Sequence, residues 1–345
     1  MLGKIPYYLG NFVFTKCFTP KKFLNLAIAS VDWVLKKETL RSHPYYAMID
    51  PCNVCVLHCP LCPTGKGELG RTKAMMSLGE FTTIFDQMKD YLYEVYLYIW
   101  GEPLMNKDIF RMIRYAHESR VRTRISSNLN YFREGFARQI VTSGLDTLLV
   151  ALDGASQQTY EQYRRGGDFE LAVGNVREIA AEKRRQNSTT PRLIWQFLAM
   201  RHNEKEIPKA RAMARDLGFD HLKITPLRSD ASTDIFQSDE EKIASSWEWL
   251  PEDQGLSWFD YETRKKVTRN KSCKFPWSMP AVNPDGSLSP CCGVYPEKYD
   301  FGNVLHQGFA AVWNGPQYVA SRSLIAGRRS AISTVCANCL KNGFF

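Results

Sequence analysis

Cysteine is the residue type whose spacing points most directly to chemistry in this 345-residue sequence. One group of thiols occupies a single short segment and consists of Cys52, Cys55, Cys59 and Cys62. A second group lies further along the chain and consists of Cys273, Cys291, Cys292, Cys336 and Cys339. Disulfide frameworks are typical of small secreted chains, and this chain is neither small nor headed by a recognisable secretory signal. The short spacings therefore predict metal ligation.

The spacing Cys55-x3-Cys59-x2-Cys62 favours an iron–sulfur cluster, because the irons of a cube lie close enough for one turn to supply several thiolates. Structural zinc is the main alternative, but zinc sites usually pair two CxxC elements across a longer spacer. A ferredoxin-type cluster is a second alternative, since Cys52-x2-Cys55-x3-Cys59-Pro60 reproduces part of a ferredoxin run. The first CxxC of that run is missing, and a long α/β region follows. We expect Cys52 to be a plain buried thiol.

Two hydrophobic periodicities alternate around and after the first cysteine group. Runs rich in β-branched and aromatic residues predict strands at 45–50, 94–100, 122–126, 147–152, 193–199 and 221–225. Helical spacing predicts helices at 78–91, 107–119, 134–143, 169–185 and 204–217. This α/β alternation implies right-handed βαβ units and a parallel sheet. Periodicity alone does not distinguish an open doubly wound sheet from an incomplete barrel.

The rest of the chain completes a four-part organisation. We expect a helical extension at 1–44, the βα region at 45–225, a connector at 226–270 and a small cysteine-rich module at 271–345. Apolar residues make up 44% and charged residues 23%, values that exclude long disorder and coiled coil. No window holds the ~18 apolar residues of a membrane span. The net charge of +9 suits acidic partners, and we read no nucleic-acid patch.

The first cysteine motif, placed after the first strand of six βα units, resembles that of the radical S-adenosylmethionine (AdoMet) superfamily. The resemblance implies a partial (βα)6 barrel in which Cys55, Cys59 and Cys62 hold a 4Fe–4S cluster. The open fourth iron of that cluster would chelate the amino and carboxylate groups of AdoMet. One departure is Leu61, which replaces an aromatic residue often found before the third cysteine.

Strand-end motifs extend the resemblance in the same chain order, since barrel active sites are built from these ends. The second strand ends in Trp100-Gly-Glu-Pro103, similar to the family's Gly-Gly-Glu, so Gly101 and Glu102 are predicted AdoMet contacts. The third ends in Ser126-Ser-Asn128, similar to Ser-Thr-Asn-Gly with Leu129 in place of glycine, which implicates Ser126 and Asn128 at the ribose. After the fourth strand, Arg164 is the predicted partner of the AdoMet carboxylate.

The second cysteine group resembles the SPASM/twitch extension of radical AdoMet enzymes. Its spacing, Cys273-x17-Cys291-x44-Cys336-x2-Cys339, is similar to that of 2-deoxy-scyllo-inosamine dehydrogenase. The resemblance implies one auxiliary 4Fe–4S cluster with four protein ligands, with Cys291 favoured over Cys292. Structural zinc is the alternative for this module.

These resemblances imply a radical enzyme in which a 5′-deoxyadenosyl radical abstracts a hydrogen atom from substrate carbon. Net dehydrogenation of a sugar, aminocyclitol or similar small molecule is the first expectation. Modification of a lipid or lipid-linked substrate and maturation of a ribosomal peptide are the alternatives, and a non-catalytic electron carrier is the rival class. Flavodoxin or ferredoxin is the implied reductant, and we expect a cytoplasmic protein, with peripheral contact at the inner face of the membrane as one possibility.

Residues 1–30 contain four lysines and no acidic residue, and Leu24, Ile28, Val31 and Leu35 form one helical stripe. Two interpretations fit this pattern. The favoured one buries the stripe against the barrel and leaves the lysines solvated. The other lays a basic amphipathic helix on an anionic membrane surface, with residues 1–37 as the contact.

Overall fold

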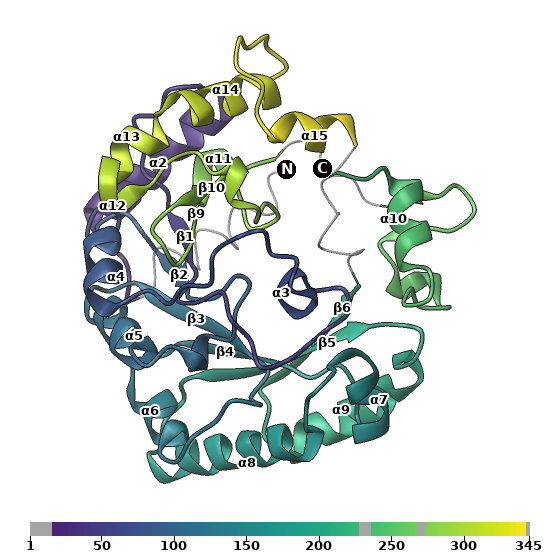
Figure 1. Ribbon diagram of the computed structural model, residues 1–345. Coiled ribbons are helices and arrows are strands. Elements are labelled where there is room, and N and C mark those ends of the chain that lie inside the picture. Colours follow the sequence, from purple (N-terminus) through teal and green to yellow (C-terminus); the bar gives the residue numbers. More distant parts are fainter. Residues whose placement is uncertain (1–15, 228–235, 268–272, 343–345) are drawn as a thin grey trace.

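A single twisted sheet of eight strands forms the centre of the computed structural model, which describes residues 16–227, 236–267 and 273–342 (Figure 1). The strand order is β10-β9-β1-β2-β3-β4-β5-β6. The first six strands are β1 (Tyr46–Ile49), β2 (Glu94–Tyr96), β3 (Arg122–Ser127), β4 (Thr147–Ala151), β5 (Arg192–Ala199) and β6 (His221–Pro226). Each pairs in parallel with the next. In the described ranges the two edge strands do not pair with each other, so the predicted partial barrel is confirmed and is open.

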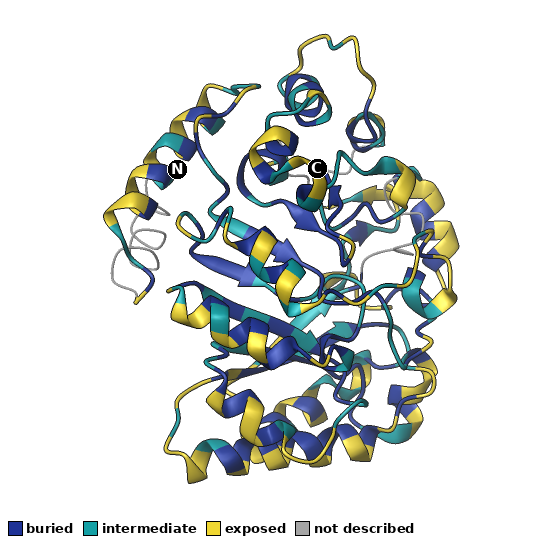
Figure 2. Cartoon of the chain, turned by 60° about the vertical axis from the view of Figure 1, so that its left-hand side comes forward, coloured by how far each residue is buried: buried dark blue, intermediate teal, exposed yellow. Residues whose placement is uncertain are grey.

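Helices cover the outer side of this sheet (Figure 1). They are α4 (Leu78–Phe85), α5 (Ile109–Glu118), α6 (Phe136–Thr142), α8 (Phe169–Arg185) and α9 (Ile207–Asp216), close to the predicted ranges. Alternate strand residues such as Val95, Ile125 and Leu148 point at these helices and are fully buried in one apolar core. Figure 2 shows the result, with dark sheet interior and exposed residues along the outer helix surfaces.

Two local differences from the predicted elements have clear causes. The sequence analysis missed the short helix α7 (Gln157–Tyr163), which is polar apart from two tyrosines and begins at the Ser156 cap. Strand β2 ends at Tyr96 rather than at residue 100. Beyond it, the backbone amides of Ile99 and Trp100 donate to the Asp50 carboxylate instead of to a neighbouring strand.

The C-terminal module extends the same sheet. Strand β9 (Ala281–Val282) pairs in parallel with β1, and β10 (Leu288–Ser289) returns antiparallel to β9 after the Asn283–Gly286 turn. Arg71 strengthens the junction, because its buried guanidinium binds Asp300 at 2.6 Å and the Tyr295 carbonyl at 3.0 Å. The module's helices are α11 (Phe275–Ser278), α12 (Val304–Gln307), α13 (Phe309–Trp313), α14 (Pro316–Ile325) and α15 (Cys336–Lys341). The sheet therefore crosses the boundary predicted near residue 271.

The predicted connector carries structure of its own in its described part. It contains α10 (Asp239–Ser246) and the hairpin strands β7 (Phe259–Asp260) and β8 (Lys265–Lys266). Residues 228–235 and 268–272 lie outside the described residues. Ser238 begins α10 with a capping box to Glu241, which is the turn chemistry expected of a Ser- and Glu-rich segment.

Helix α2 (Pro20–Val34) contradicts the favoured interpretation of the N-terminal stripe. Lys22, predicted to be solvated, is only 2% exposed, whereas Leu24 and Val31 are 61% and 51% exposed. The polar face is buried because it has specific partners in the protein, which are described below. The part of the prediction that concerns residues 1–15 lies outside the described residues. Among the described helices, none has the length and apolar character needed to cross a membrane.

Candidate iron–sulfur and AdoMet site

The first cysteine group lies in the loop between β1 and the short helix α3 (Pro63–Lys66), on the inner side of the sheet (Figure 1). The loop is packed closely against its surroundings. The His58 amide donates to the Arg165 carbonyl at 2.9 Å, and the Glu102 amide donates to the Val54 carbonyl at 2.8 Å. Gly65 is required here, since a Cβ at that position would lie 2.5 Å from the backbone nitrogen of Cys59. The loop therefore holds its thiols in a fixed backbone frame.

The sulfur atoms of this loop accept hydrogen bonds from the loop backbone, from the end of β3 and from the residue that follows α7. The Cys55 sulfur accepts from the Leu57 amide at 3.4 Å and from the Asn128 side-chain amide at 3.5 Å. The Arg164 guanidinium lies 3.8 Å from the Cys59 sulfur. The pKa of Cys55 is raised to about 12, chiefly by burial and then by the neighbouring Glu102, Cys59 and Cys62 groups, while the hydrogen bond from the Leu57 amide lowers it. As thiolates these buried groups would repel each other, and the N–H donors aimed at them would offset part of that repulsion. Such thiolates suit ligation to the iron atoms of an iron–sulfur cluster.

Cys52 has a different environment, as the sequence predicts. It is fully buried, and its thiol donates to the Glu102 carbonyl at 3.1 Å. Burial raises the pKa of this thiol, and the Asp50 carboxylate adds to the effect. A neutral thiol that donates to a backbone carbonyl has a structural role.

Buried carboxylates connect the carboxyl ends of neighbouring strands, and the sequence analysis missed this pattern. Asp50 after β1 accepts from two amides after β2, and Glu102 after β2 accepts from the Asn128 amide after β3 at 2.9 Å. Asp153 after β4 accepts from the Leu198 amide of β5 at 2.7 Å. Burial raises the pKa of both Asp50 and Glu102 to about 7. The available signal was an acidic residue one to six positions beyond the ends of β1, β2 and β4.

The structure brings most of the predicted AdoMet residues to one edge of the sheet. Glu102 and Asn128 are in direct contact, and Asn128 contacts Cys55. Arg164 stands beside Cys59, but its guanidinium is paired with Asp153 at 2.6 Å. Ser126 is half-buried on β3. Their contacts with AdoMet stay predictions.

Gly101 and Leu129 have backbone environments that the sequence alone does not reveal. A Cβ on Gly101 would lie 2.1 Å from the Cys52 carbonyl oxygen, so this glycine accommodates the cysteine loop itself. Leu129 has a φ of 53°, the left-handed conformation that glycine adopts most readily, although it is a buried leucine. The turn geometry is thus retained where the glycine is replaced.

The second cysteine group also converges. Burial raises the pKa of Cys291 well above its usual value, and the four other thiols of the group, Cys292, Cys339, Cys273 and Cys336, raise it further. Cys336 is hydrogen-bonded by the hydroxyls of Ser321 and Thr334. Cys291 packs with Cys339 and Val335 in a small apolar cluster. Across the described ranges, no three His, Cys, Asp or Glu side chains are arranged to hold a single metal ion. The assignment of four of these thiols to an auxiliary cluster stays a prediction.

The chain just beyond Cys292 contacts the turn that follows β2. Trp100 of that turn packs edge-on against Tyr295, with ring centres 5.1 Å apart. The Tyr295 carbonyl accepts from the Arg71 guanidinium at 3.0 Å. The auxiliary cysteine segment therefore adjoins the carboxyl end of β2, where Gly101 and Glu102 lie.

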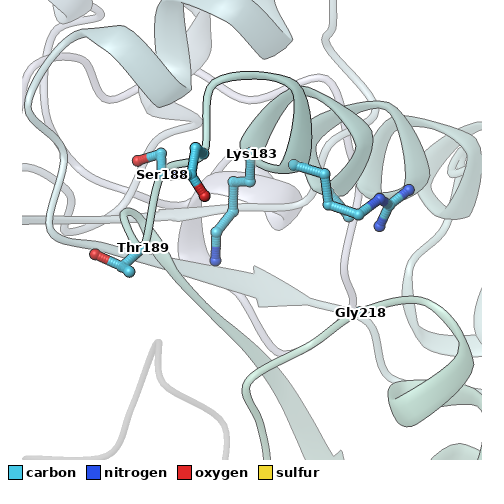
Figure 3. A pocket seen from close by; sticks show the side chains of 7 residues that line it. Lys183, Ser188, Thr189 and Gly218 are labelled. Carbon is cyan, nitrogen blue, oxygen red and sulfur yellow. The ribbon is translucent and has the colours of Figure 1, made fainter.

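A surface pocket elsewhere does not belong to this site. It is lined by Lys183, Arg184, Ser188, Thr189, Gly218 and two neighbours (Figure 3). It lies between the end of α8 and the start of β5, at the amino ends of the strands. Lys183 is paired with Asp220 at 3.1 Å. The cysteine loop occupies the opposite edge of the sheet.

Comparison with protein families gives two matches in this chain. Residues 49–194 match the radical SAM superfamily, and residues 273–340 match SPASM, an iron–sulfur cluster-binding domain. These two segments contain both cysteine groups described above.

Curated relatives share about a quarter of the residues. The AdoMet-dependent heme synthase of Methanosarcina barkeri is 25% identical over 64% of this chain, and the match covers 59% of that protein. The PqqA peptide cyclase of Gluconobacter oxydans is 25% identical over 80% of this chain and 78% of its own length.

Solved structures confirm the fold. Streptococcus suis SuiB superimposes with a TM-score of 0.64 at 15% identity, covering 99% of this chain and 80% of its own. BtrN in complex with AdoMet and 2-DOIA has a TM-score of 0.50 at 15% identity, covering 81% of this chain and 86% of its own.

Proposed function

Because this chain belongs to the radical S-adenosylmethionine superfamily and carries a C-terminal SPASM domain, we propose that it oxidises an unactivated carbon of a small hydroxylated substrate. The cofactors implied by these domains are 4Fe–4S clusters and AdoMet. When bound, they supply reductive cleavage of AdoMet to methionine and a 5′-deoxyadenosyl radical that removes a hydrogen atom from carbon.

The residues of this chain would bind and orient those groups. Cys55, Cys59 and Cys62 would ligate the AdoMet cluster, and Cys273, Cys291, Cys336 and Cys339 the auxiliary cluster. The buried Glu102 carboxylate keeps the ends of β2 and β3 in register beside Cys55. Gly101, Glu102, Ser126, Asn128 and Arg164 are our candidates for AdoMet contacts. For Arg164 this role requires that one edge of its guanidinium faces AdoMet while the other remains on Asp153.

The observation that carries the proposal of net oxidation is the contact between the auxiliary cysteine segment and the turn after β2, where the rings of Trp100 and Tyr295 pack with centres 5.1 Å apart. A substrate held beside this turn would lie near both cysteine groups. The auxiliary thiols would hold a cluster there that would supply the electron acceptor for the oxidation, and water or a basic side chain would take the proton. A simple electron carrier has no use for this arrangement.

The polar character of the inner face supports a hydroxyl-rich substrate. Glu94 binds Arg124 at 2.8 Å, and the Arg124 guanidinium lies 5.2 Å from the centre of the Tyr96 ring. Tyrosine hydroxyls and a Glu–Arg pair offer both donors and acceptors to neutral polyols. A sugar or aminocyclitol is the substrate class that we put first. BtrN, which was solved with 2-DOIA, is a structural neighbour that agrees with this choice.

Peptide modification is the second candidate, and a specific observation favours it. The PqqA peptide cyclase and the mycofactocin maturase of Mycobacterium ulcerans both align with more than three-quarters of this chain. SuiB was solved bound to its precursor peptide SuiA. We also propose a flavodoxin or ferredoxin as the reductant and keep a lipid-linked molecule as a further candidate substrate. A peripheral contact with the inner membrane face is argued below.

The test is anaerobic reconstitution with iron and sulfide, followed by AdoMet, a strong reductant and a panel of substrates. Formation of 5′-deoxyadenosine and of a product two hydrogens lighter with a polyol supports the proposal. A cross-linked product with a peptide, and no response to polyols, favours the second candidate. A matched variant, Cys339→Ala, should still form 5′-deoxyadenosine but should lose the oxidised product. Full oxidation by that variant would refute the role of the auxiliary site.

A further inference from the structure

Helix α2 presents its apolar face to the outside and its polar face to the protein, the reverse of an ordinary surface helix. Its buried residues are Lys22, Asn25, Ala29 and Asp32. Its exposed apolar side chains are large: Phe23 is 44% exposed, Leu24 61%, Val31 51% and Val34 73%, and Leu35 just beyond the helix is 57% exposed.

Specific hydrogen bonds fix this inverted orientation. The Lys22 ammonium donates to the Arg120 carbonyl at 2.7 Å. Asn25 forms a reciprocal pair with the His43 backbone, donating at 3.0 Å and accepting at 2.8 Å. Asp32 accepts from the Ser42 hydroxyl at 2.8 Å and pairs with Lys37 at 3.1 Å. Rotating the helix to bury its leucines would break all of these bonds, so the apolar face is held outward.

Basic side chains flank this face at both ends. Lys16 and Lys21 are exposed near the start of the helix. At the other end, Arg328 is attached because its guanidinium donates to the Lys36 carbonyl at 2.8 Å, whereas Lys37 is held by the buried Asp32. Lys21 and Arg328 form exposed ion pairs with Asp90 and Glu38, and such pairs are weak enough to exchange for other anions.

We propose that the outward apolar face of α2, with the cations at its two ends, docks the protein reversibly on the surface of an anionic lipid bilayer. Interfacial helices combine these two features, burying apolar side chains at headgroup depth while lysines and arginines bind phosphates. The five exposed apolar residues offer on the order of 500 Å², the size of the large apolar patches that mark interaction sites on monomers. The lysines and arginine beside the patch match the negative charge of an anionic lipid surface.

Docking of α2 on a bilayer would also orient the C-terminal cysteine module, because α2 is packed against that module. Trp33 of α2 packs edge-on against Trp277 with ring centres 5.0 Å apart, and the Trp277 indole donates to the Lys37 carbonyl at 2.9 Å. Trp277 lies in α11, just after Cys273. The inference does not depend on the proposed catalytic function, because binding is measured without cofactors or substrate.

The test is co-sedimentation of the full-length protein with vesicles of phosphatidylcholine, alone or mixed with phosphatidylglycerol. We expect binding to the anionic vesicles at low salt, at least about tenfold weaker binding to neutral vesicles, and release by high salt, since each basic residue near such a surface contributes roughly fivefold. The triple substitution Leu24→Ser, Val31→Ser and Val34→Ser should weaken binding at least tenfold. Leu171→Ser is the matched control, because Leu171 is a leucine of α8 that is 45% exposed.

The inference is overturned if the wild-type protein ignores anionic vesicles, or if the triple variant binds them as well as the Leu171 control does. Equal binding to neutral and anionic vesicles would also overturn it. A wild-type dimer that ignores vesicles and becomes monomeric in the triple variant would assign the face to a second copy of the chain. Circular dichroism checks that the variants are folded, which is expected since the replaced side chains are exposed.

Discussion

Replacing Gly101 with alanine should displace the first cysteine loop. The added Cβ would lie 2.1 Å from the Cys52 carbonyl oxygen and 2.9 Å from that of Val54. Real Cβ contacts are essentially never below 3.0 Å, so the loop or the β2 turn must shift by about 1 Å, because both clashing atoms belong to the backbone and have no rotamer to change. Overpacking of this kind costs about 1–3 kcal/mol of stability.

The functional cost should exceed the stability cost. A misplacement of about 1 Å at a reacting centre can lower a rate ~100-fold, and here the shift acts on the loop that carries Cys55 and on the Glu102 turn together. The assays are iron content after reconstitution, 5′-deoxyadenosine formation and thermal unfolding. Gly174→Ala is the control, since that glycine lies within α8 with nothing near its added Cβ. The control should be neutral or slightly stabilising. Normal iron content, 5′-deoxyadenosine formation and unfolding temperature in Gly101→Ala would refute the reasoning.

Three further predictions concern the thiols and the buried carboxylates. Cys59→Ala should abolish 5′-deoxyadenosine formation. Cys52→Ala removes only a hydrogen bond to a carbonyl and should retain it. Equal loss in both variants would contradict the assignment of Cys59, and not Cys52, as a cluster ligand. Reconstituted wild-type protein should hold about eight irons and Cys339→Ala about four, whereas four irons plus one zinc in the wild type would mean a structural zinc module. Burial raises the pKa of Asp50 from 3.8 to about 7, so the folded protein retains a proton that the unfolded chain releases, and stability should fall as pH rises from about 4 to about 7. Asp50→Asn should reduce this fall in urea unfolding of the cluster-free protein, and an unchanged pH dependence would contradict it.

The sequence by itself determined the elements that build the site and the order in which they occur. Thiol spacing, strand periodicity and strand-end motifs are local properties, so they can be read without knowing the fold. The radical SAM and SPASM identities rested on such patterns, and the comparisons confirm them. Parallel pairing of β1–β6 followed from the alternation of strands and helices, because parallel strands need crossover connections.

The tertiary structure alone decided what each polar residue does. The contact of Gly101 with AdoMet stays a prediction, and the fold adds a second reason for this glycine, its close approach to the Cys52 carbonyl. Asp50 looked like the end of a strand, yet it holds the β2 turn, a contact across 49 residues of chain. The orientation of α2 could not be read from its amphipathic pattern. Hydrophobic periodicity identifies two faces of a helix but not which one is buried, and here hydrogen bonds from Lys22, Asn25 and Asp32 to distant backbone groups turn the polar face inward.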